Sequence, residues 1–324
     1  MRRAAPAFVA AGLCLLPLAL IEPRTYVALT IAGLAMGMLV FLVASGLTLI
    51  FGLMDVLNFA HGALFSWGAY AGFTMLFTLN RRTGWTYSPS VALNALSLLL
   101  AVAAATLVAA SLGIVLERVI VRPVYGQHMF QILIPLGATI VLEELIRIAW
   151  GPNDQVVPVP ATLQGSWDVA DVIVLRFPIL AIGLGLLVYL GMVLALRRTR
   201  VGLIVRAGVE NREMIQVLGH NIYRYFTGVF AAGAALAALG GLMWAIFNQS
   251  VRPTMGGEQL LFAFIVVIIG GLGSVTGSVI GALLVGLAYN YVAFLLPQAA
   301  VGVNLAVMVL VLLVRPTGLY GTAR

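Results

Sequence analysis

The chain has 324 residues, of which 62% are hydrophobic and only 9% are charged. Soluble globular proteins carry about 25% charged residues, so this composition excludes that class and predicts an all-α, polytopic membrane protein. The long continuous apolar runs exclude a β-barrel, whose strands would read as short alternating segments. We therefore expect one membrane domain over residues 1–324, built as a bundle of eight to ten transmembrane helices with glycine-broken segments.

The charged and sulfur-containing residues exclude several kinds of chemistry. All 18 basic residues are arginine, and the formal net charge is +7. Without lysine the chain has neither a P-loop for ATP nor a Schiff-base nucleophile. The single cysteine, Cys14, excludes an internal disulfide and a cysteine-rich metal site. The arginines cluster in loops beside apolar segments, as the positive-inside rule predicts, so we expect no nucleic-acid partner.

Candidate transmembrane helices are apolar segments of about 20 residues. The first one follows Arg2 and Arg3 and would suit a signal peptide, but no small-residue cleavage site follows it, which favours a retained helix. Several of the candidates are short or interrupted by glycine, hence the range of eight to ten. In chain order they span about 6–21, 27–50, 57–79, 91–116, 129–149, 177–196, 225–247, 260–272, 277–296 and 303–314.

A polar break interrupts the second and third of these segments, where residues 52–62 read GLMDVLNFAHG. A polar or ionisable group at bilayer depth is costly unless it is buried in protein or lines a wet path, and irregular backbone is tolerated there on the same terms. The break is therefore the first candidate for a place where solute meets the protein. The residues that we assign to a substrate pathway are Asp55, Asn58, His61, Ser66 and Tyr70.

Each polar residue of the break also has a structural interpretation. Asp55 suits an N-cap for a helix that begins at Val56, as an alternative to contact with substrate. Asn58 and His61 are three residues apart and would share one helix face. They would either hold the broken helix together by hydrogen bonds or contact the solute. No group of residues has metal-ligand spacing, and no nucleophile–base pair or pair of carboxylates suggests an enzyme.

Two further polar groups occur near the ends of apolar segments. Glu143 and Arg147 have the i,i+4 spacing and order of a favourable helical ion pair, beside Glu144. Asn248 and Gln249 follow an apolar segment, where they would cap the helix or meet a partner protein. The stretch 152–177 is net acidic, and its prolines and Trp167 predict an ordered cap outside the membrane.

The stretch from Arg197 to Arg224 is the most basic loop, and we place it in the cytoplasm. With ten crossings, Arg81 and Arg82 then fall outside, against the positive-inside rule. Within the loop, RAGVENREMIQVL (206–218) predicts one short amphipathic helix. Its polar face would carry Arg212, Glu213 and Gln216, and its apolar face Met214, Ile215 and Leu218. Gly219 would end the helix. The helix suits either a soluble partner or a resting place on lipid headgroups.

A second glycine-rich interruption reads GGLGSVTG over residues 270–277. Paired interruptions in the two halves of a transporter indicate the binding region. The alternative is that such glycines let helices pack closely, as Gly277 and Gly281 would. The positions that we predict as hinges or turns are Gly52, Gly62, Gly270, Gly271, Gly273 and Gly277.

Four stretches together resemble one known family. GLTLIFGLMDVLNFAHGALFSWGAYAG resembles the signature region of branched-chain amino acid ABC transporter permeases, the LivH-like subunit. RAGVENREMIQVLGHNIYR is similar to that family's cytoplasmic loop. GGLGSVTGSVIGALLVG and LLVRPTGLYG resemble its last two characteristic stretches. The four occur in the family's order and cover most of the chain from about residue 27. The loop departs from the family at Ile215, Gln216 and His220.

The resemblance implies a multi-pass inner-membrane permease subunit of an ATP-driven importer for branched-chain or related hydrophobic amino acids. It implies four partners: a second permease, two ABC ATPase subunits and a periplasmic solute-binding protein. ATP and Mg²⁺ would bind the ATPase subunits, and no cofactor is expected in this chain. The residues that it assigns to coupling with the ATPase are Arg206, Glu210, Asn211, Glu213, Leu218 and Gly219. Alternatives are a permease for urea, short amides or aromatic and carboxylic acids, and a passive channel or ion-coupled carrier.

Overall fold

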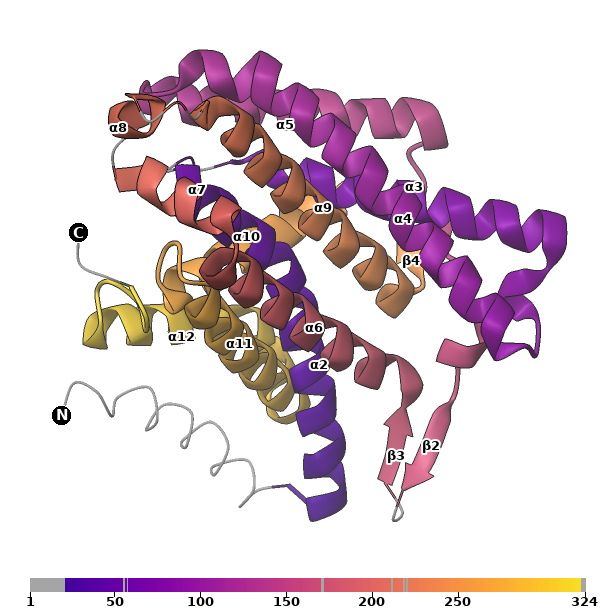
Figure 1. The fold of residues 1–324 in the computed structure, drawn as a ribbon. Coiled ribbons are helices and arrows are strands. Elements are labelled where there is room, and N and C mark those ends of the chain that lie inside the picture. Colours follow the sequence, from indigo (N-terminus) through magenta and orange to yellow (C-terminus); the bar gives the residue numbers. More distant parts are fainter. Residues whose placement is uncertain are drawn as a thin grey trace.

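A computed structural model describes residues 21–321, apart from 55, 57, 170, 171, 211, 218 and 220. The described part is a bundle of tilted helices with two small antiparallel strand pairs at one end (Figure 1). Five helical segments are long and apolar enough to cross a membrane, and α10 and α12 are shorter apolar helices. The predicted class of helical, polytopic membrane protein is therefore confirmed.

The helices correspond closely to the predicted spans. The α-helices are α2 (Pro23–Met54), α3 (His61–Thr83), α4 (Val91–Leu116), α5 (His128–Trp150), α6 (Arg176–Arg198), α7 (Arg200–Glu210), α8 (Arg212–Val217), α9 (Ile222–Asn248), α10 (Met255–Gly270), α11 (Val275–Leu295) and α12 (Ala300–Val314). Nine of the ten predicted segments are helices here. Residues 1–20, which hold nearly all of the first segment and Cys14, lie outside the described part.

Short elements connect the helices. A π-helix, η2 (Glu117–Val121), extends α4, and the short 3-10 helices are η1 (Trp85–Tyr87), η3 (Arg122–Val124), η4 (Ala161–Leu163) and η5 (Pro297–Ala299). The strands are β1 (Gln155–Val156), β2 (Ser166–Val169), β3 (Val172–Leu175) and β4 (Ser250–Val251). Strands β2 and β3 form a hairpin in which Ser166 pairs with Leu175, and β1 pairs with β4. The stretch 152–177 is thus ordered, as predicted.

The bundle has two chemically different ends. One end, here called the basic end, holds the stretch with α7 and α8, the junction of α4 and η2, and the turn between α10 and α11 (Figure 1). The other, here called the opposite end, holds the connection between α3 and α4, the β2–β3 hairpin and the start of α2. The arginines of the basic end are Arg118, Arg122, Arg197, Arg198, Arg200, Arg206, Arg224 and Arg315.

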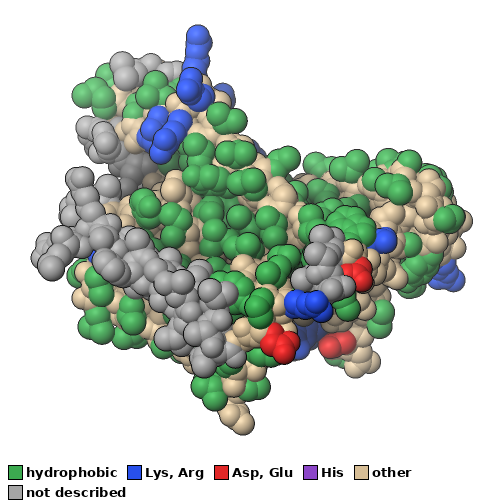
Figure 2. Space-filling view, turned by 90° about the horizontal axis from the view of Figure 1, so that it is seen from below, with side chains coloured by type: hydrophobic (Ala, Val, Ile, Leu, Met, Phe, Trp, Pro, Cys, Tyr) green, Lys and Arg blue, Asp and Glu red, His purple; other side chains and the backbone are tan. Residues whose placement is uncertain are grey.

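Most of the surface between the two ends is hydrophobic. Seen from below, the molecule shows mainly apolar side chains, and the acidic ones visible in that view lie toward its right side (Figure 2). Leu187 of α6 and Ile148 of α5 are among the large apolar side chains that face outward, at 67% and 75% exposure. An apolar belt of this kind suits contact with lipid tails or with other membrane helices.

The helices pack as two inverted sets. Helix α2 packs against α11, and α9 packs against α4, while α2 and α9 pack against each other at the centre. In the same way α3 contacts α9, α4 and α5, and α10 contacts α2, α11 and α12. The set α2–α5 thus corresponds to the set α9–α12 with its ends exchanged. Inverted repeats of this kind are common in transporters and place their binding sites at the repeat interface.

Candidate functional site

Helix α3 begins inside the bundle instead of at its basic end. Its first residue, His61, is fully buried, and its Nε2 lies 3.0 Å from the carbonyl oxygen of Val43. Val43 precedes the end of α2 at Met54 by 11 residues, which corresponds to about 16 Å along a helix. Between Met54 and His61 the chain therefore returns from the basic end to the middle of the bundle before α3 starts.

Asn58 shapes the last part of this return. Its Oδ1 accepts a hydrogen bond from the amide of Ala60 at 3.1 Å, and its carbonyl oxygen accepts one from the amide of His61 at 3.2 Å. An asparagine that bonds to backbone two residues ahead forms a turn of its own. The predicted helix start at residue 57 is thus delayed to His61. Nδ2 of Asn58 and Nδ1 of His61 have no hydrogen-bond partner among the described residues.

The remaining pathway candidates lie along α3. Ser66 is fully buried, and its Oγ lies 3.4 Å from the carbonyl oxygen of Pro253. Tyr70 is also fully buried, with its ring centroid 5.2 Å from that of Trp150. Asp55 lies outside the described residues. The structure thus gathers Asn58, His61 and Ser66 where α3 enters the core, and it places Tyr70 with the aromatic residues nearer the opposite end.

Helix α10 also starts inside the bundle, and it enters from the opposite end. Residues 249–254 return inward after the end of α9, and α10 starts where Gly256 packs directly on Gly62. The two helices run antiparallel here, because Ser66 contacts Pro253 while Phe59 packs on Phe264 at 5.3 Å. Two helices that start inside the bundle therefore meet side by side.

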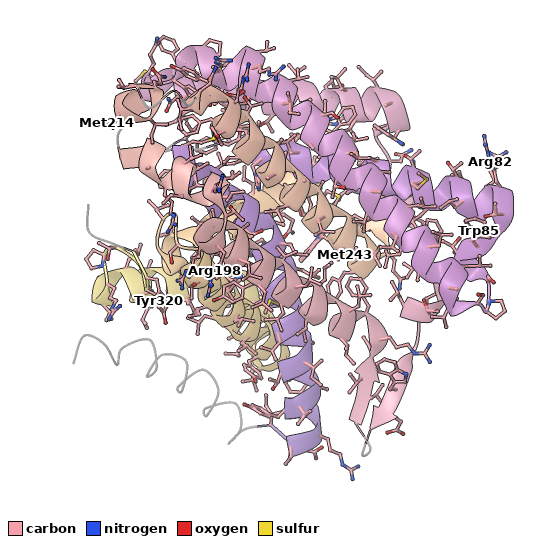
Figure 3. All side chains as sticks on the ribbon, viewed as in Figure 1. Arg82, Trp85, Arg198, Met214, Met243 and Tyr320 are labelled. Carbon is pink, nitrogen blue, oxygen red and sulfur yellow. The ribbon has the colours of Figure 1, made fainter. Side chains whose placement is uncertain are left out.

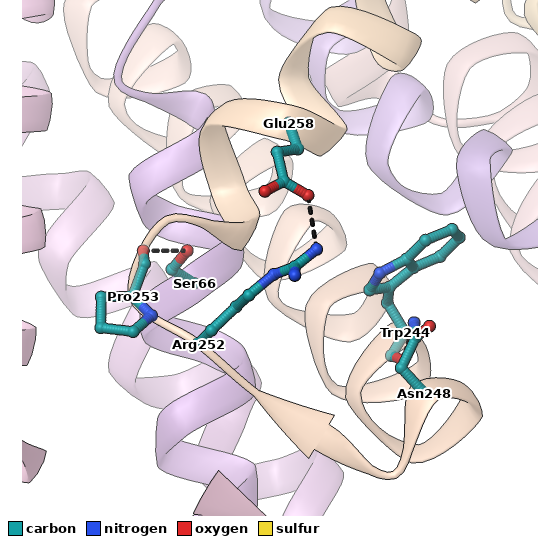
Figure 4. Close-up of polar contacts among 6 residues, drawn as sticks. All are labelled: Ser66, Trp244, Asn248, Arg252, Pro253 and Glu258. Carbon is teal, nitrogen blue, oxygen red and sulfur yellow. Dashed lines mark hydrogen bonds and ion pairs between the residues drawn. The ribbon is translucent and has the colours of Figure 1, made fainter. Parts of the chain in front are cut away.

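The end of α9 is capped locally. Nδ2 of Asn248 donates to the carbonyl oxygen of Trp244 at 2.9 Å (Figure 4). Gln249 takes the left-handed conformation, with φ 56°, and its amide donates to the carbonyl oxygen of Ile246. Of the two interpretations of Asn248 and Gln249, the structure thus provides the helix cap.

A charged pair that the sequence analysis missed stands in this second return. Nη2 of Arg252 donates to Oε2 of Glu258 at 2.7 Å, and both side chains are about half exposed (Figure 4). The available signal was the stretch RPTMGGE, which puts two charges around a Pro–Gly break between apolar helices. The sequence analysis singles out only Asn248 and Gln249, which directly precede this stretch.

The predicted Glu143–Arg147 ion pair is wrong. Arg147 pairs instead with Glu144, at 3.2 Å and i,i+3 spacing. The reason is position on α5: Glu144 and Arg147 both point outward, whereas Glu143 is half-buried and lies toward α10. Oε1 of Glu143 lies 3.9 Å from the place that a Cβ on Gly257 would occupy. Among the described residues Glu143 forms no ion pair, although the charge of Arg147 still acts on its carboxylate.

The predicted hinge glycines divide into three pairs. Gly271 and Gly273 have φ angles of 98° and 80° and make the turn between α10 and α11, as predicted. Gly52 and Gly62 are not at turns, because both lie inside helices. A Cβ on Gly52 would lie 2.7 Å from Cα of Gly273, so close helix packing explains this glycine.

The other two predicted positions flank the same turn. Gly270 is the last residue of α10, and Gly277 lies in the first turn of α11. The two glycines pack directly on each other. The interruption at 270–277 thus lies at the basic end and does not correspond to the break at 52–62. The segment 249–256 corresponds to it instead.

The described residues of the predicted helix over 206–218 are all helical, in the end of α7 and in α8. Helix α7 starts earlier, directly after α6, where Oγ1 of Thr199 accepts a hydrogen bond from the amide of Gly202 at 3.1 Å. Gly219 follows α8 with φ 85°, which is the predicted helix end. Asn211, Leu218 and His220 lie outside the described residues, as do the side chains of Glu210, Arg212 and Glu213.

A cavity of about 850 Å³ opens at the basic end. Arg197 and Arg206 contribute the charged part of its lining, and Ile268 of α10 and Leu272 of the following turn contribute apolar side chains. Nε of Arg206 donates to the carbonyl oxygen of Gly202 at 3.2 Å, and this bond holds the side chain in place at the cavity wall.

Helix α8 presents apolar side chains to the outside. Met214 is 55% exposed and Val217 is 83% exposed, whereas Ile215 is buried. Met214 stands at the tip of the basic end, far from Arg82 and Trp85 at the opposite end (Figure 3). The predicted apolar face of Met214 and Ile215 is thus divided between surface and core. Exposed apolar side chains at the tip of a bundle suit a protein partner.

Residues 29–313 match the family model described as "Branched-chain amino acid transport system / permease component". The chain belongs to this family. Its place in the family makes it a membrane permease component of a transport system and not an enzyme. No solved structure matches the chain.

Several relatives of this permease cover nearly its whole length. It is 30% identical over 301 residues to the high-affinity branched-chain amino acid transport system permease protein LivH of Escherichia coli, covering 89% of this chain and 93% of the relative. It is 30% identical to the corresponding protein BraD of Pseudomonas aeruginosa, over 91% and 96% of the two chains. A probable LivH of Methanocaldococcus jannaschii is 26% identical over 311 residues.

Proposed function

We propose that this permease is one membrane-spanning subunit of an ATP-driven importer that carries branched-chain amino acids across the inner membrane. The whole chain, 1–324, would form a single transmembrane domain with one cytoplasmic coupling stretch at 197–224. A second permease would complete the solute path, two ABC ATPase subunits would bind ATP and Mg²⁺, and a periplasmic binding protein would deliver the solute.

The observation that carries this proposal is the meeting of α3 and α10 inside the bundle. Both helices start after a short return, between Met54 and His61 and between Asn248 and Met255, and they enter from opposite ends. Irregular backbone at membrane depth is tolerated only where it is buried in protein or lines a cavity. Discontinuous helices at a repeat interface are typical of solute sites in transporters. This geometry favours a path between the inverted halves over a passive apolar scaffold.

The charge difference between the two ends supports an orientation in which the basic end faces the cytoplasm. The basic end carries eight described arginines, and Glu117 is the one acidic side chain described there. At the opposite end the arginines, Arg81 and Arg82 among them, are balanced by carboxylates such as Asp154, Asp168 and Glu22. An excess of arginine marks the cytoplasmic side. We therefore place α7, α8 and the cavity of Arg197 and Arg206 in the cytoplasm.

The coupling role of α7 and α8 rests on their place between two spans. They join α6 to α9, and α9 packs against α2, α3 and α4 at the centre of the bundle. A partner that moved Met214 and Val217 would thus act on the helix that contacts both inverted halves. An ATPase subunit is the partner that an ATP-driven importer requires at this position. Direct coupling contacts from Arg206, Glu210, Asn211, Glu213, Leu218 and Gly219 remain part of this proposal.

Purification of the assembled system tests the proposal. The tagged chain, expressed together with its genomic neighbours, is extracted in detergent and its ATPase activity is measured with binding proteins loaded with candidate ligands. We expect two ATPase subunits and a second permease to co-purify. Leucine, isoleucine or valine on the binding protein should stimulate ATP hydrolysis.

Other results would change the proposal in specific ways. Stimulation only by urea, amides or carboxylic acids would keep the importer and replace its substrate. A chain that purifies alone and conducts solute into liposomes without ATP would instead be a channel or carrier. Gly219→Pro separates these two classes, because a channel does not depend on the turn after α8, whereas an importer would lose coupling.

A further inference from the structure

The cavity of about 850 Å³ at the basic end has walls from separate parts of the chain. Its volume falls within the range of about 300–1,000 Å³ that is typical of pockets for small ligands. Phe51 comes from the last turn of α2, Ser274 directly precedes α11, and Leu312 lies in the last turn of α12. Arg197 comes from the last turn of α6 and Arg206 from α7. Because helices begin and end around it, the cavity lies where the apolar span of the bundle meets its basic end.

The C-terminal tail forms one wall of this cavity and is held in place by hydrogen bonds. The amide of Leu319 donates to the carbonyl oxygen of Ile269 at 2.8 Å, and the amide of Tyr320 donates to that of Gly270 at 3.0 Å. Nη1 of Arg315 donates to the carbonyl oxygen of Leu319 at 2.8 Å. These bonds fix the tail on the end of α10 and keep Tyr320 at the cavity. The wall is therefore formed by the chain itself.

The positive charge of the lining is not neutralised within the described part of the chain. No acidic side chain is among the described residues that line the cavity. Arg197 is exposed and makes no hydrogen bond or ion pair with any described residue. Arg206 uses only its Nε, on the carbonyl oxygen of Gly202. Ser274 caps α11 by accepting from the amide of Gly277 at 3.1 Å, so the positive end of that helix dipole also lies here. This lining favours an anion.

An apolar surface leads away from the charged part of the cavity. Ile268 and Leu312 belong to the lining itself. Beside it Leu272 is 51% exposed, and on α12 Leu313 is 82% and Leu310 47% exposed. Helix α12 packs on α10 and α11 and lies at the edge of the bundle (Figure 1). A free ion has no use for this surface, whereas a ligand with an anionic head and apolar chains matches both parts.

We propose that this cavity binds the head group of an anionic phospholipid, with the phosphate on Arg197 and Arg206 and the acyl chains along Leu310 and Leu313. Guanidinium groups bind phosphate oxygens through paired, charge-assisted hydrogen bonds. Basic pockets between membrane helices on the cytoplasmic side bind phospholipid head groups in other proteins. Tyr320 adds a hydroxyl donor to the lining. The inference goes beyond transport and holds whatever solute the permease carries.

A bound head group would also stabilise this end of the molecule. Arg197 and Arg206 lie on α6 and α7, whereas Ser274 and Tyr320 lie on the turn before α11 and on the tail. A phosphate that contacts both sides would join them. Because a ligand that binds only the folded state raises its stability, the lipid should raise the melting temperature.

Native mass spectrometry tests the proposal on the full chain, purified in detergent with any subunits that accompany it. With phosphatidylglycerol and phosphatidylcholine added in equal amounts, the wild-type chain should retain phosphatidylglycerol preferentially. Arg197→Gln and Arg206→Gln should each lower that retention by roughly tenfold, as expected for the loss of a charge-assisted hydrogen bond. Arg198→Gln is the matched control and should retain the lipid, because it removes the same charge from an exposed neighbour that does not line the cavity.

Melting temperatures in lipid-free detergent show whether the variants fold. Arg197→Gln gives the decisive result, because it removes no bond within the described part of the chain and should leave this temperature unchanged. Equal retention of the two lipids by the wild-type chain would overturn the proposal, and so would an equal loss of phosphatidylglycerol in Arg198→Gln.

Two further results would assign the cavity to another ligand and also overturn the proposal. If inorganic phosphate alone raised the melting temperature as much as phosphatidylglycerol does, the ligand would be a free phosphate. If Arg197→Gln lost its ATPase subunits but kept its lipid, the arginine would contact an acidic surface of a protein partner. Neither readout measures uptake, so a failed importer function would leave this test intact.

Discussion

His61 anchors the start of α3 by a single contact in a dry environment. Its ring is fully buried, and Nε2 lies 3.0 Å from the carbonyl oxygen of Val43, a group that α2 otherwise directs toward its own amides. The ring also fills the space that glycine leaves free at position 46, where a Cβ would lie 2.8 Å from Cε1. The histidine therefore fixes how deeply the start of α3 lies in the bundle.

His61→Ala should lower the stability of the protein and should not act through lost contact with the solute. Removal of a buried ring and its hydrogen bond costs about 2–4 kcal/mol. We expect a lower melting temperature and less assembled complex in detergent. Ser66→Ala is the control, because its hydroxyl contact is long, at 3.4 Å, and it should cost less than about 1 kcal/mol. An unchanged melting temperature with lost uptake would place His61 in the solute path instead.

Glu117 is a buried carboxylate at the π-helical turn that ends α4. It is fully buried and accepts hydrogen bonds from Tyr125 at 2.9 Å and from Thr227 of α9 at 2.7 Å. π-Helical turns are rare and frequent at functional sites. This carboxylate ties the junction of α4 and η2 to the first turns of α9, the helix that follows α7 and α8.

Thr227→Val tests how much this contact stabilises the basic end. The substitution keeps the shape of the side chain but removes the donor, so a buried carboxylate loses one of two partners. We expect a loss of about 1–3 kcal/mol, measured by thermal denaturation of the purified protein. Ser111→Ala, at an exposed hydroxyl that bonds only within α4, should be nearly neutral. Equal melting temperatures for the two variants would contradict this assignment.

At the scale of elements, the contact between α3 and α10 depends on glycine. Gly62 and Gly256 pack backbone to backbone, and a Cβ on Gly62 would also lie 3.2 Å from Cβ of Leu260. Small residues let membrane helices approach this closely. The pair sets the distance between the two helices that start inside the bundle.

Gly62→Ala should separate the two helix starts. The added methyl group meets backbone atoms that have no rotamers with which to yield, so overpacking costs about 1–3 kcal/mol. Gly137→Ala in α5 is the matched control, because nothing lies within 4 Å of its added Cβ. We expect a lower melting temperature and lower uptake for the first variant only. A melting temperature for Gly62→Ala equal to that of the control would mean that the contact is looser than the structure has it.

Helix α8 is the element that offers apolar contact at the basic end. Val217 is 83% exposed, so Val217→Asp should be tolerated by the fold and yet weaken a contact with an ATPase subunit. Val156→Asp at the opposite end is the control, with a similar exposure of 79%. We expect less co-purifying ATPase for Val217→Asp and an unchanged amount for Val156→Asp. Equal recovery of ATPase in both would remove α8 from the coupling surface.

The helices were predictable because their signal is local. Long apolar runs between charged loops set α2, α4, α6 and α9 to within a few residues, and the turn at Gly271 and Gly273 was visible as a glycine cluster. Pairing between helices is not local, so the sequence pointed to 270–277 as the counterpart of 52–62. That place belongs to 249–256, which the contact between Gly62 and Gly256 reveals.

The candidate site was predictable in part for the same reason. The break with Asn58 and His61 stands out against apolar sequence, and the structure brings these residues to the helix crossing. The pair of Arg252 and Glu258 did not stand out, because six positions separate them in the sequence and only the bend into α10 brings their side chains together. The i,i+4 spacing of Glu143 and Arg147 gave the wrong partner, since helical spacing ignores the neighbouring helix.

At the scale of the whole molecule, the inverted arrangement brings together the one helix of each half that starts inside the bundle. Helix α3 brings a return that starts at the basic end, and α10 brings one that starts at the opposite end, so the two meet inside the bundle. Relative motion of the halves would change both returns together. Helices α7 and α8 adjoin α9, which contacts α2, α3 and α4.

The direction of transport depends on which end faces the cytoplasm, and labelling of single cysteines decides it. Cys14, the one cysteine, is first replaced by serine, and Arg82→Cys and Arg198→Cys are then made separately. Both positions are exposed, at opposite ends of the bundle (Figure 3). Because arginine excess marks the cytoplasmic side, a membrane-impermeant maleimide should label the cysteine at 82 in intact spheroplasts and the cysteine at 198 only after lysis. The reverse pattern would put α7 and α8 outside, where no ATPase subunit can reach them, and the importer mechanism would fail with it.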